Sequence, residues 1–278
     1  MMTLCGLLPI AVPLAPAQDL SGAAKLYGRA MYREALAEIA AQSGTSAKLL
    51  AGKCHFGLGD FKKSQEMFEA VIKATPDSSA AYHWLGKALG RRAETASFVV
   101  APRLASQCRQ AFEKSVQLDG KNLEAVNDLI EYYLEAPGFL GGGVDKAEGL
   151  ADKVGAIDPV EHQFARAKIA EKKKDFAAAE SHLRKASDMA PREIGRLLDL
   201  ARFLARRGRV GESDAVFAQA EKLDPASPKF LYARAETYVE GKRNLAEAKS
   251  LLERYLKSPV TPDDPPRADA EKLLKKAG

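Results

Sequence analysis

Apolar residues recur along most of the chain at positions i, i+3 and i+4, which is the spacing of amphipathic helices. Short breaks, most of them marked by proline, divide this pattern, and two of these prolines, Pro191 and Pro225, lie 34 residues apart. Counting back 5, 8 and 12 positions from each break gives a triplet of small and apolar residues. The triplets are Ser64, Phe68 and Val71; Cys108, Phe112 and Ser115; Ala147, Ala151 and Val154; Ala179, Leu183 and Ala186; and Ser213, Phe217 and Ala220. Small residues let paired helices approach and large ones fill the space between pairs, so the pattern predicts stacked helical hairpins.

A longer motif follows the same period. Tyr82-x2-Leu85-Gly86-x2-Leu89 is its clearest copy, and looser copies begin at Tyr32, Val126, Leu197 and Leu231. Residues 19–260 therefore resemble the tetratricopeptide repeat family, whose helix-turn-helix unit of about 34 residues reads W-x2-L-G-x2-Y, then A-x3-F-x2-A, then P. The resemblance implies an all-α fold: a right-handed α-solenoid of about seven tetratricopeptide-like helix-turn-helix repeats with a C-terminal capping helix.

Three segments are expected: residues 1–17 as a signal peptide, 18–260 as the solenoid and 261–278 as the capping helix. The first segment is apolar and uncharged and ends in Ala15-Pro16-Ala17, an A-x-A-like cleavage site. We therefore expect an exported protein, in the periplasm of a diderm bacterium. A cytosolic tail on a cytoplasmic protein is the alternative, because this leader has no Lys or Arg.

The capping helix is expected over residues 267–277, after three closely spaced prolines. Asp264 is a candidate N-cap and Pro265 a candidate first helical residue. The polar residues of this helix, Lys272, Lys275 and Lys276, suit a solvated outer face.

Two insertions interrupt the repeats. The first, over residues 92–107, contains the apolar segment 98–102, which either folds back on the solenoid or forms a partner-binding edge. The second, over residues 136–143, is rich in glycine, but Val144 and Asp145 stand where a phosphate-binding P-loop needs Lys and Ser/Thr. It predicts a bend with positive φ at its glycines and with Phe139 and Leu140 tucked beneath.

Composition and charge exclude several classes of protein. The 278 residues include 42 Lys and Arg against 37 Asp and Glu, a net charge of +5, and 46% hydrophobic residues. These values argue against a disordered chain, collagen and a disulfide-dense miniprotein. Beyond the leader no apolar run approaches the roughly 18 residues that span a bilayer, so we expect no integral membrane segment in the mature chain.

No catalytic or metal-binding pattern stands out. The four histidines form neither H-x3-H nor H-E-x2-H, and C-x2-C and G-x-S-x-G are absent. We expect no enzymatic activity, no metal and no cofactor. Cys54 and Cys108 are expected to be buried small side chains, with one disulfide as the alternative.

In the tetratricopeptide repeat family, positions 2, 5, 9, 12 and 13 of each first helix usually line a concave groove. Read at positions 5, 9 and 13, the candidate binding residues are Lys53, His83, Lys87, Arg91, Asn127, Glu131, Glu135, Lys168, Lys172, Arg202, Arg206, Glu236 and Glu240. Positions 9 and 13 carry like charges in five consecutive helices, and each such pair costs about 0.2–0.5 kcal/mol. Something must compensate this repulsion.

Lateral ion pairs between neighbouring repeats are one compensation. Glu131 and Glu135 would then lie between the basic pairs on either side, and Glu236 and Glu240 would face Arg202 and Arg206. This scheme leaves Lys168 and Lys172 beside Arg202 and Arg206 with no acids between them.

A charged partner is the other compensation. Residues 171–209 hold 11 bases and 6 acids, whereas residues 123–162 hold 2 bases and 9 acids. A basic band beside an acidic band would orient a charged protein or peptide, and the acidic band argues against nucleic acid.

The leading hypothesis is a non-enzymatic adaptor or scaffold that binds a protein or an extended peptide of unknown identity in its groove. The clamp for peptide C-termini known in the family is absent, because positions 5 and 9 of successive copies are Leu49 and Lys53, His83 and Lys87, and Asn127 and Glu131. The alternative is an accessory solute-binding component of a transport system, which a deep apolar pocket near residues 98–102 would favour.

Overall fold

A computed structural model describes residues 19–278, so the predicted signal peptide lies outside the described residues. Within this range the chain forms 15 α-helices and one short 3-10 helix. In order they are α1 (Ser21–Gly28), α2 (Tyr32–Ile39), α3 (Thr45–Gly57), α4 (Phe61–Ala74), α5 (Ser79–Thr95), α6 (Ala101–Leu118), α7 (Leu123–Glu135), η1 (Gly138–Leu140), α8 (Val144–Gly155), α9 (Pro159–Lys172), α10 (Phe176–Met189), α11 (Ile194–Arg206), α12 (Val210–Leu223), α13 (Pro228–Glu240), α14 (Leu245–Lys257) and α15 (Arg267–Ala277). Helices α1 to α14 pair into seven hairpins, and the predicted all-α repeat fold is confirmed.

Local sequence explains where many of these helices begin. The side chains of Asp60, Asn122 and Asp175 accept hydrogen bonds from the backbone N–H three residues ahead, at 3.0–3.2 Å. Each satisfies one of the N–H groups that the first turn of a helix leaves without an intrahelical partner. Pro159 and Pro228 occupy first helical positions, where a missing N–H costs nothing.

One kind of turn joins the two helices in five of the seven hairpins. Its residue with left-handed backbone is Ala30 (φ 54°), Gly59 (φ 77°), Lys174 (φ 62°), Gly208 (φ 75°) or Lys242 (φ 50°). The residue after the left-handed one donates its N–H to the carbonyl five positions before itself, as Arg209 does to Leu204 at 3.0 Å. This is the Schellman arrangement, and its recurrence at 174, 208 and 242 repeats the 34-residue period.

Small residues control how closely the hairpins pack. All of the predicted triplet residues are buried. A Cβ atom on Gly86 of α5 would lie 2.5 Å from the Phe112 ring of α6, and one on Gly52 of α3 would lie 2.5 Å from the Phe68 ring of α4. The aromatic ring of each second helix therefore sits directly against a glycine of the first, as the Leu-Gly motif predicts for Gly86.

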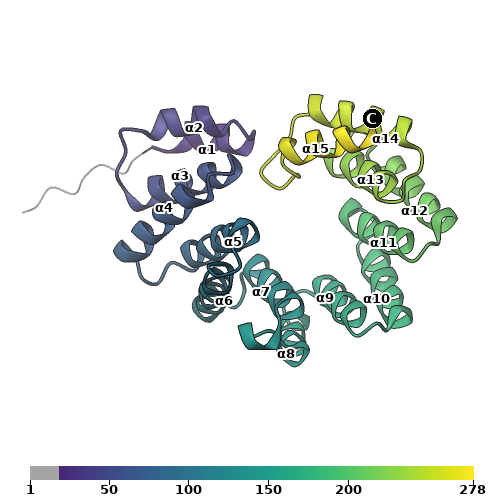
Figure 1. The fold of residues 1–278 in the computed structure, drawn as a ribbon, viewed down its shortest axis with the longest axis horizontal. Helices are drawn as coiled ribbons and strands as arrows, with labels where there is room; N and C mark the ends of the chain where they lie inside the picture. Colours follow the sequence, from purple (N-terminus) through teal and green to yellow (C-terminus); the bar gives the residue numbers. More distant parts are fainter. Residues whose placement is uncertain (1–18) are drawn as a thin grey trace, which may run out of the picture.

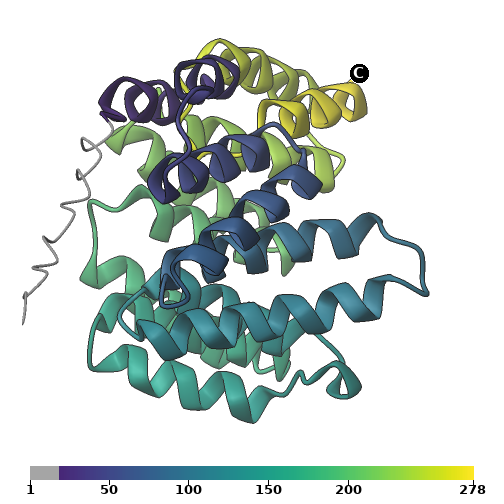
Figure 2. The same cartoon turned by 90° about the vertical axis from the view of Figure 1, so that its left-hand side faces the viewer.

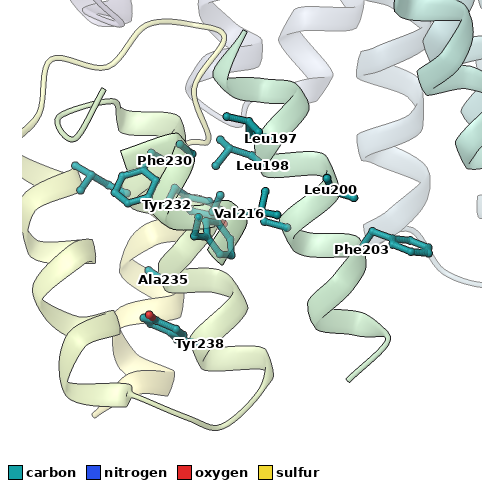
Figure 3. Close-up of a cluster of buried hydrophobic side chains, with 14 of the residues drawn as sticks. Leu197, Leu198, Leu200, Phe203, Val216, Phe230, Tyr232, Ala235 and Tyr238 are labelled. Atoms are coloured by element: carbon teal, nitrogen blue, oxygen red, sulfur yellow. The ribbon is translucent and has the colours of Figure 1, made fainter. Parts of the chain in front are cut away.

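The hairpins stack into a curved array (Figure 1). From α5 to α14, the first helix of each hairpin lies on the inner side of the curve and the second on the outer side. One core cluster runs from α5 to α9 and another from α9 to α15. Buried side chains such as Leu197 and Phe203 project from different sides of α11, so α11 packs against the repeats before and after it (Figure 3).

The array curves so far that its two ends meet (Figures 1 and 2). Ala30, in the turn between α1 and α2, packs against the core cluster that contains α13 to α15. α15 itself packs on α13 and α14 through the buried Ala270, and its Lys272, Lys275 and Lys276 are exposed as predicted. The predicted N-cap is wrong, because Pro266 precedes the helix and Asp264 instead accepts from the Thr261 N–H at 2.8 Å.

The first insertion lengthens two helices and leaves a short exposed loop. α5 and α6 extend to 17 and 18 residues, with residues 96–100 between them. Phe98 is 90% exposed and Val99 70% exposed, so this segment does not fold back on the solenoid. The other predicted arrangement, a partner-binding edge, stays a prediction.

The second insertion forms η1 and a bend at Gly141, whose φ of +87° is left-handed as predicted, whereas Gly138, Gly142 and Gly143 do not have the left-handed φ that was expected of them too. Gly142 is needed for a different reason, since a Cβ there would lie 1.8 Å from the Ala136 carbonyl oxygen. The prediction that Phe139 is tucked under the bend is wrong, because its side chain is 82% exposed. Leu140 instead anchors the bend through its carbonyl, which accepts from the Tyr132 hydroxyl at 3.0 Å.

The glycine-aromatic contact predicts opposite effects for two helical glycines. Gly86→Ala should lower the free energy of unfolding by about 1–3 kcal/mol, because the new methyl group overlaps the Phe112 ring. Gly149→Ala, in the middle of α8 with open space around it, should raise it by about 0.5–1 kcal/mol. Urea denaturation followed by circular dichroism compares the two, and equal effects would contradict the packing argument.

The left-handed turn predicts a backbone effect without any clash. Gly208→Ala meets no atom within 4 Å, yet should destabilise by about 1–2 kcal/mol because its φ is +75°. Gly211→Ala lies three residues on, inside α12 and also in open space, and serves as the matched control. The same denaturation measurement should show no loss for this control.

Candidate functional site

The thirteen predicted groove residues all lie on first helices of the hairpins, α3, α5, α7, α9, α11 and α13. From α5 onward these helices line the inner side of the curve (Figure 1). What each side chain can do depends on its neighbours across the repeats.

Between α7 and α9 the predicted lateral ion pairs form. Lys168 Nζ lies 2.6 Å from Glu131 Oε2, and Lys172 Nζ lies 3.6 Å from Glu135 Oε1. The glutamate pair on α7 is thus neutralised by the lysine pair of the following repeat. The expected second partners of these acids, Lys87 and Arg91 on α5, form no ion pair with them in the structure described.

Between α9 and α11 the structure corrects the sequence-based picture. Arg206 donates from one guanidinium nitrogen to both carboxylate oxygens of Glu171, at 2.9 and 3.1 Å. An acid does therefore lie between the two basic pairs. Glu171 occupies position 12 of its repeat, which is one of the inward positions. Reading position 12 as well as positions 9 and 13 would have identified this acid from the sequence.

The pairs continue to α13. Arg202 Nη2 lies 2.9 Å from Glu236 Oε2, as the lateral scheme predicted. Burial raises the pKa of Glu236 above its ordinary value, and the charge of Arg202 opposes that shift. We call the four pairs Glu131–Lys168, Glu135–Lys172, Glu171–Arg206 and Arg202–Glu236 the ion-pair ladder. The predicted contact of Glu240 with Arg206 does not form, and the Glu240 side chain is exposed.

A buried layer lies beside the ladder. Glu161 of α9 pairs with Arg196 of α11, and the two side chains are only 12% and 16% exposed. Asn127 of α7 donates to the same carboxylate at 2.8 Å. Asn127 therefore holds neighbouring helices together. Its partner Glu161 occupies the inward position 2, which was not among the positions read for candidate residues.

His83 is not available at the groove surface. Its side chain is 2% exposed, and Nε2 lies 2.7 Å from Asp128 Oδ2 of the next repeat. The histidine is part of the packing between α5 and α7, so its place in the predicted groove set is wrong.

The basic residues of α3 and α5 differ from those of the ladder. Lys53 and Lys87 form no ion pair within residues 19–278; their ammonium groups lie 5.2 and 4.5 Å from the centre of the Trp84 ring. Arg91 lies over the Phe61 ring at 5.2 Å and pairs only with Glu94 of its own helix. Burial lowers the pKa of Lys53, with Lys87 adding to the shift.

These residues border a cavity of about 570 Å³ where the two ends of the array meet, which we call the closure cavity. Its walls come from α1 to α5, the segment before α15 and α15 itself. The cavity does not adjoin residues 98–102, where a pocket would have favoured a solute carrier.

The structure offers few other reactive groups. Cys54 and Cys108 are both buried and not bonded to each other, and burial raises their pKa values to about 11 and about 12, so neither is a reactive thiolate. No group of three or more metal-ligating side chains gathers among the described residues. None of the described helices is long and apolar enough to cross a bilayer.

Comparison with known proteins agrees with the architecture. Residues 49–96 and 198–265 match the family model of the tetratricopeptide repeat. No curated protein matches the sequence. A tetratricopeptide repeat protein from Parabacteroides merdae has a similar structure, with a TM-score of 0.60 at 10% identity over 90% of each chain.

Two further solved structures are similar at lower scores. The Cut9–Hcn1 hetero-tetramer of the APC/C matches with a TM-score of 0.53 at 14% identity, over 92% of this chain and 48% of that one. The human IFIT1 dimer with PPP-AAAA matches with a TM-score of 0.52 at 21% identity, over 84% of this chain and 53% of that one. At these identities the likeness concerns the fold, which serves generally as a scaffold for protein interactions. The seven stacked hairpins, the turns that recur every 34 residues and the two matching segments show that the chain has the tetratricopeptide repeat fold, and that residues 49–96 and 198–265 are repeats of this family.

Proposed function

We propose that this protein is a non-enzymatic adaptor that binds an extended segment of a partner protein along the inner face of α7 to α13. The ion-pair ladder is the observation that carries the proposal. Its charges lie on the inner helices, and Glu131 and Glu135 are 60% and 73% exposed. A charged side chain of a partner can replace one member of such a pair and bind the other.

The energetics favour this exchange. An exposed ion pair contributes only about 0–1 kcal/mol, so opening one to contact a partner costs little. The buried pair of Glu161 and Arg196 keeps the helices in register meanwhile. The inner face thus combines a fixed scaffold with charges that can change partner, which suits recognition of a charged peptide.

The polarity of the ladder indicates which partner fits. In its two pairs between α7 and α9 the acid is the more exposed member, and Glu240 adds an exposed carboxylate without an ion pair in the described chain. A segment rich in Lys or Arg would therefore bind at α7. This narrows the expected charged partner to a basic one, because acids already neutralise the basic band at α9 and α11.

We further propose that the chain acts in the periplasm. The apolar, uncharged residues 1–17 and the Ala15-Pro16-Ala17 site support this location. The mass of the protein isolated from its native cells tests it: loss of residues 1–17 is expected, and a mass that includes them would contradict export by cleavage.

Reversing the ladder pairs separates recognition from stability. Changing only the bases to Glu would place acids against acids and destabilise the fold. A variant with Glu131→Lys, Glu135→Lys, Lys168→Glu and Lys172→Glu keeps both pairs with reversed sign. We expect its unfolding free energy to stay within about 1 kcal/mol of wild type.

The same variant should lose the partner. A photo-crosslinking amino acid at the exposed Glu240 on the inner helix α13, or at the exposed Glu253 on the outer helix α14, is introduced into the full chain in its native cells. Crosslinks to a protein are expected from the inner position, to be absent from the outer one and to be lost in the folded reversed variant. Equal crosslinking from both positions, or an unchanged pattern in the variant, would overturn the adaptor proposal.

A further inference from the structure

The closure cavity has a different chemistry from the ladder. Every base of the ladder forms an ion pair with an acid from another repeat, whereas Lys53 and Lys87 form no ion pair within the described chain, and Glu124 of α7 opposes only part of the burial-driven fall in the pKa of Lys53. Both ammonium groups lie within 5.2 Å of the centre of the Trp84 ring, and Lys87 helps to lower the pKa of Lys53, so the two positive charges act on each other beside a half-buried surface. Two cations held in this way attract an anion.

The opposite wall does not neutralise these lysines. Asp264 accepts from the Thr261 backbone N–H and hydroxyl at 2.8 and 2.9 Å, and Asp269 pairs with Lys272 at 2.9 Å. The acids that the C-terminal segment contributes to the cavity are therefore already engaged within that segment.

Two phenols add hydrogen-bond donors. Tyr27 and Tyr32 border the cavity, and neither hydroxyl has a hydrogen-bond partner among residues 19–278. Burial raises the pKa of both, so both remain protonated and can donate. A carboxylate has the acceptor oxygens that phenols and ammonium groups require.

The rest of the cavity is apolar. Phe56 and Trp84 lie edge to face with ring centres 5.4 Å apart, and Val260 and Pro262 contribute from the C-terminal side. The volume of about 570 Å³ falls within the range of about 300–1,000 Å³ found for small-molecule sites. A ligand for this site therefore has an apolar body as well as a negative charge.

We propose that the closure cavity binds a small organic acid, with its carboxylate between Lys53 and Lys87 and its apolar body against Phe56 and Trp84. Because residues from both ends of the chain form the walls, the site exists only when the array is closed. The proposal goes beyond the adaptor function and uses none of the ladder residues, so either can fail without the other.

The single tryptophan of the sequence, Trp84, reports binding directly. The full chain is titrated with 4-phenylbutanoate, and with 4-phenylbutanamide and 4-phenylbutylamine as neutral and cationic controls, while tryptophan fluorescence is recorded. We expect saturable binding of the acid, at least about tenfold tighter than that of either control. The reason is that hydrogen bonds to a charged group are stronger than those to a neutral group by about this factor.

Variants locate the site. Lys53→Gln and Lys87→Gln should each weaken binding of the acid about tenfold, and Lys62→Gln, on the exposed face of α4, should leave it unchanged. Ala268→Phe fills the C-terminal wall without altering either lysine and should also weaken binding. Circular dichroism verifies that each variant is folded.

Several results would overturn the proposal. They are equal binding of the acid and its amide, an equal loss in Lys62→Gln, or full binding in both Lys53→Gln and Lys87→Gln. A peptide with a free C-terminal carboxylate that binds more tightly than 4-phenylbutanoate would also overturn it, because the cavity would then be a peptide site. The reversed ladder variant should bind the acid like wild type.

Discussion

The structure depends on the fact that no helical hairpin of this chain can bury its apolar face alone. Each hairpin packs its second helix against small residues of its first, as Phe112 packs on Gly86, and leaves its remaining apolar surface for the next repeat. Stacking is then the only way to remove that surface from water. The curvature, the inner face and the meeting of the two ends all follow from repeating this contact along the chain.

Charge is organised by the same stacking. Like charges four residues apart on one helix repel, but stacking brings the opposite pair of a neighbouring helix within 2.6–3.6 Å. An arrangement that is unfavourable within α7 and within α9 is thus favourable between them. Because these pairs contribute little each, they neutralise the inner face without making it rigid. The buried Glu161, Arg196 and Asn127 provide that rigidity instead.

The ladder does not extend to the N-terminal repeats, and this difference divides the molecule into two functional regions. From α7 to α13, each base of the ladder pairs with an acid of a neighbouring repeat. On α3 and α5, Lys53 and Lys87 lie over aromatic rings and border the cavity that the C-terminal segment helps to form. A ring-like closure thus gives this protein a cavity that an open stack of the same repeats would lack.

The sequence by itself determined the repeat, because the period, the small-large triplets and the Leu-Gly motif act between helices that are adjacent in the chain. Burial of the triplets, the glycine bend at 141 and the pairing of Glu131, Lys168, Arg202 and Glu236 could all be predicted on that basis. Only the tertiary structure decided the contacts that depend on exact helix rotation and on distant segments. Rotation buries His83 on Asp128 and places Glu171 between two basic pairs, and the exposed loops leave Phe98 and Phe139 in solvent. The accumulated curvature of seven hairpins brings residues 27–91 to residues 260–272, and no local pattern records a sum of small rotations.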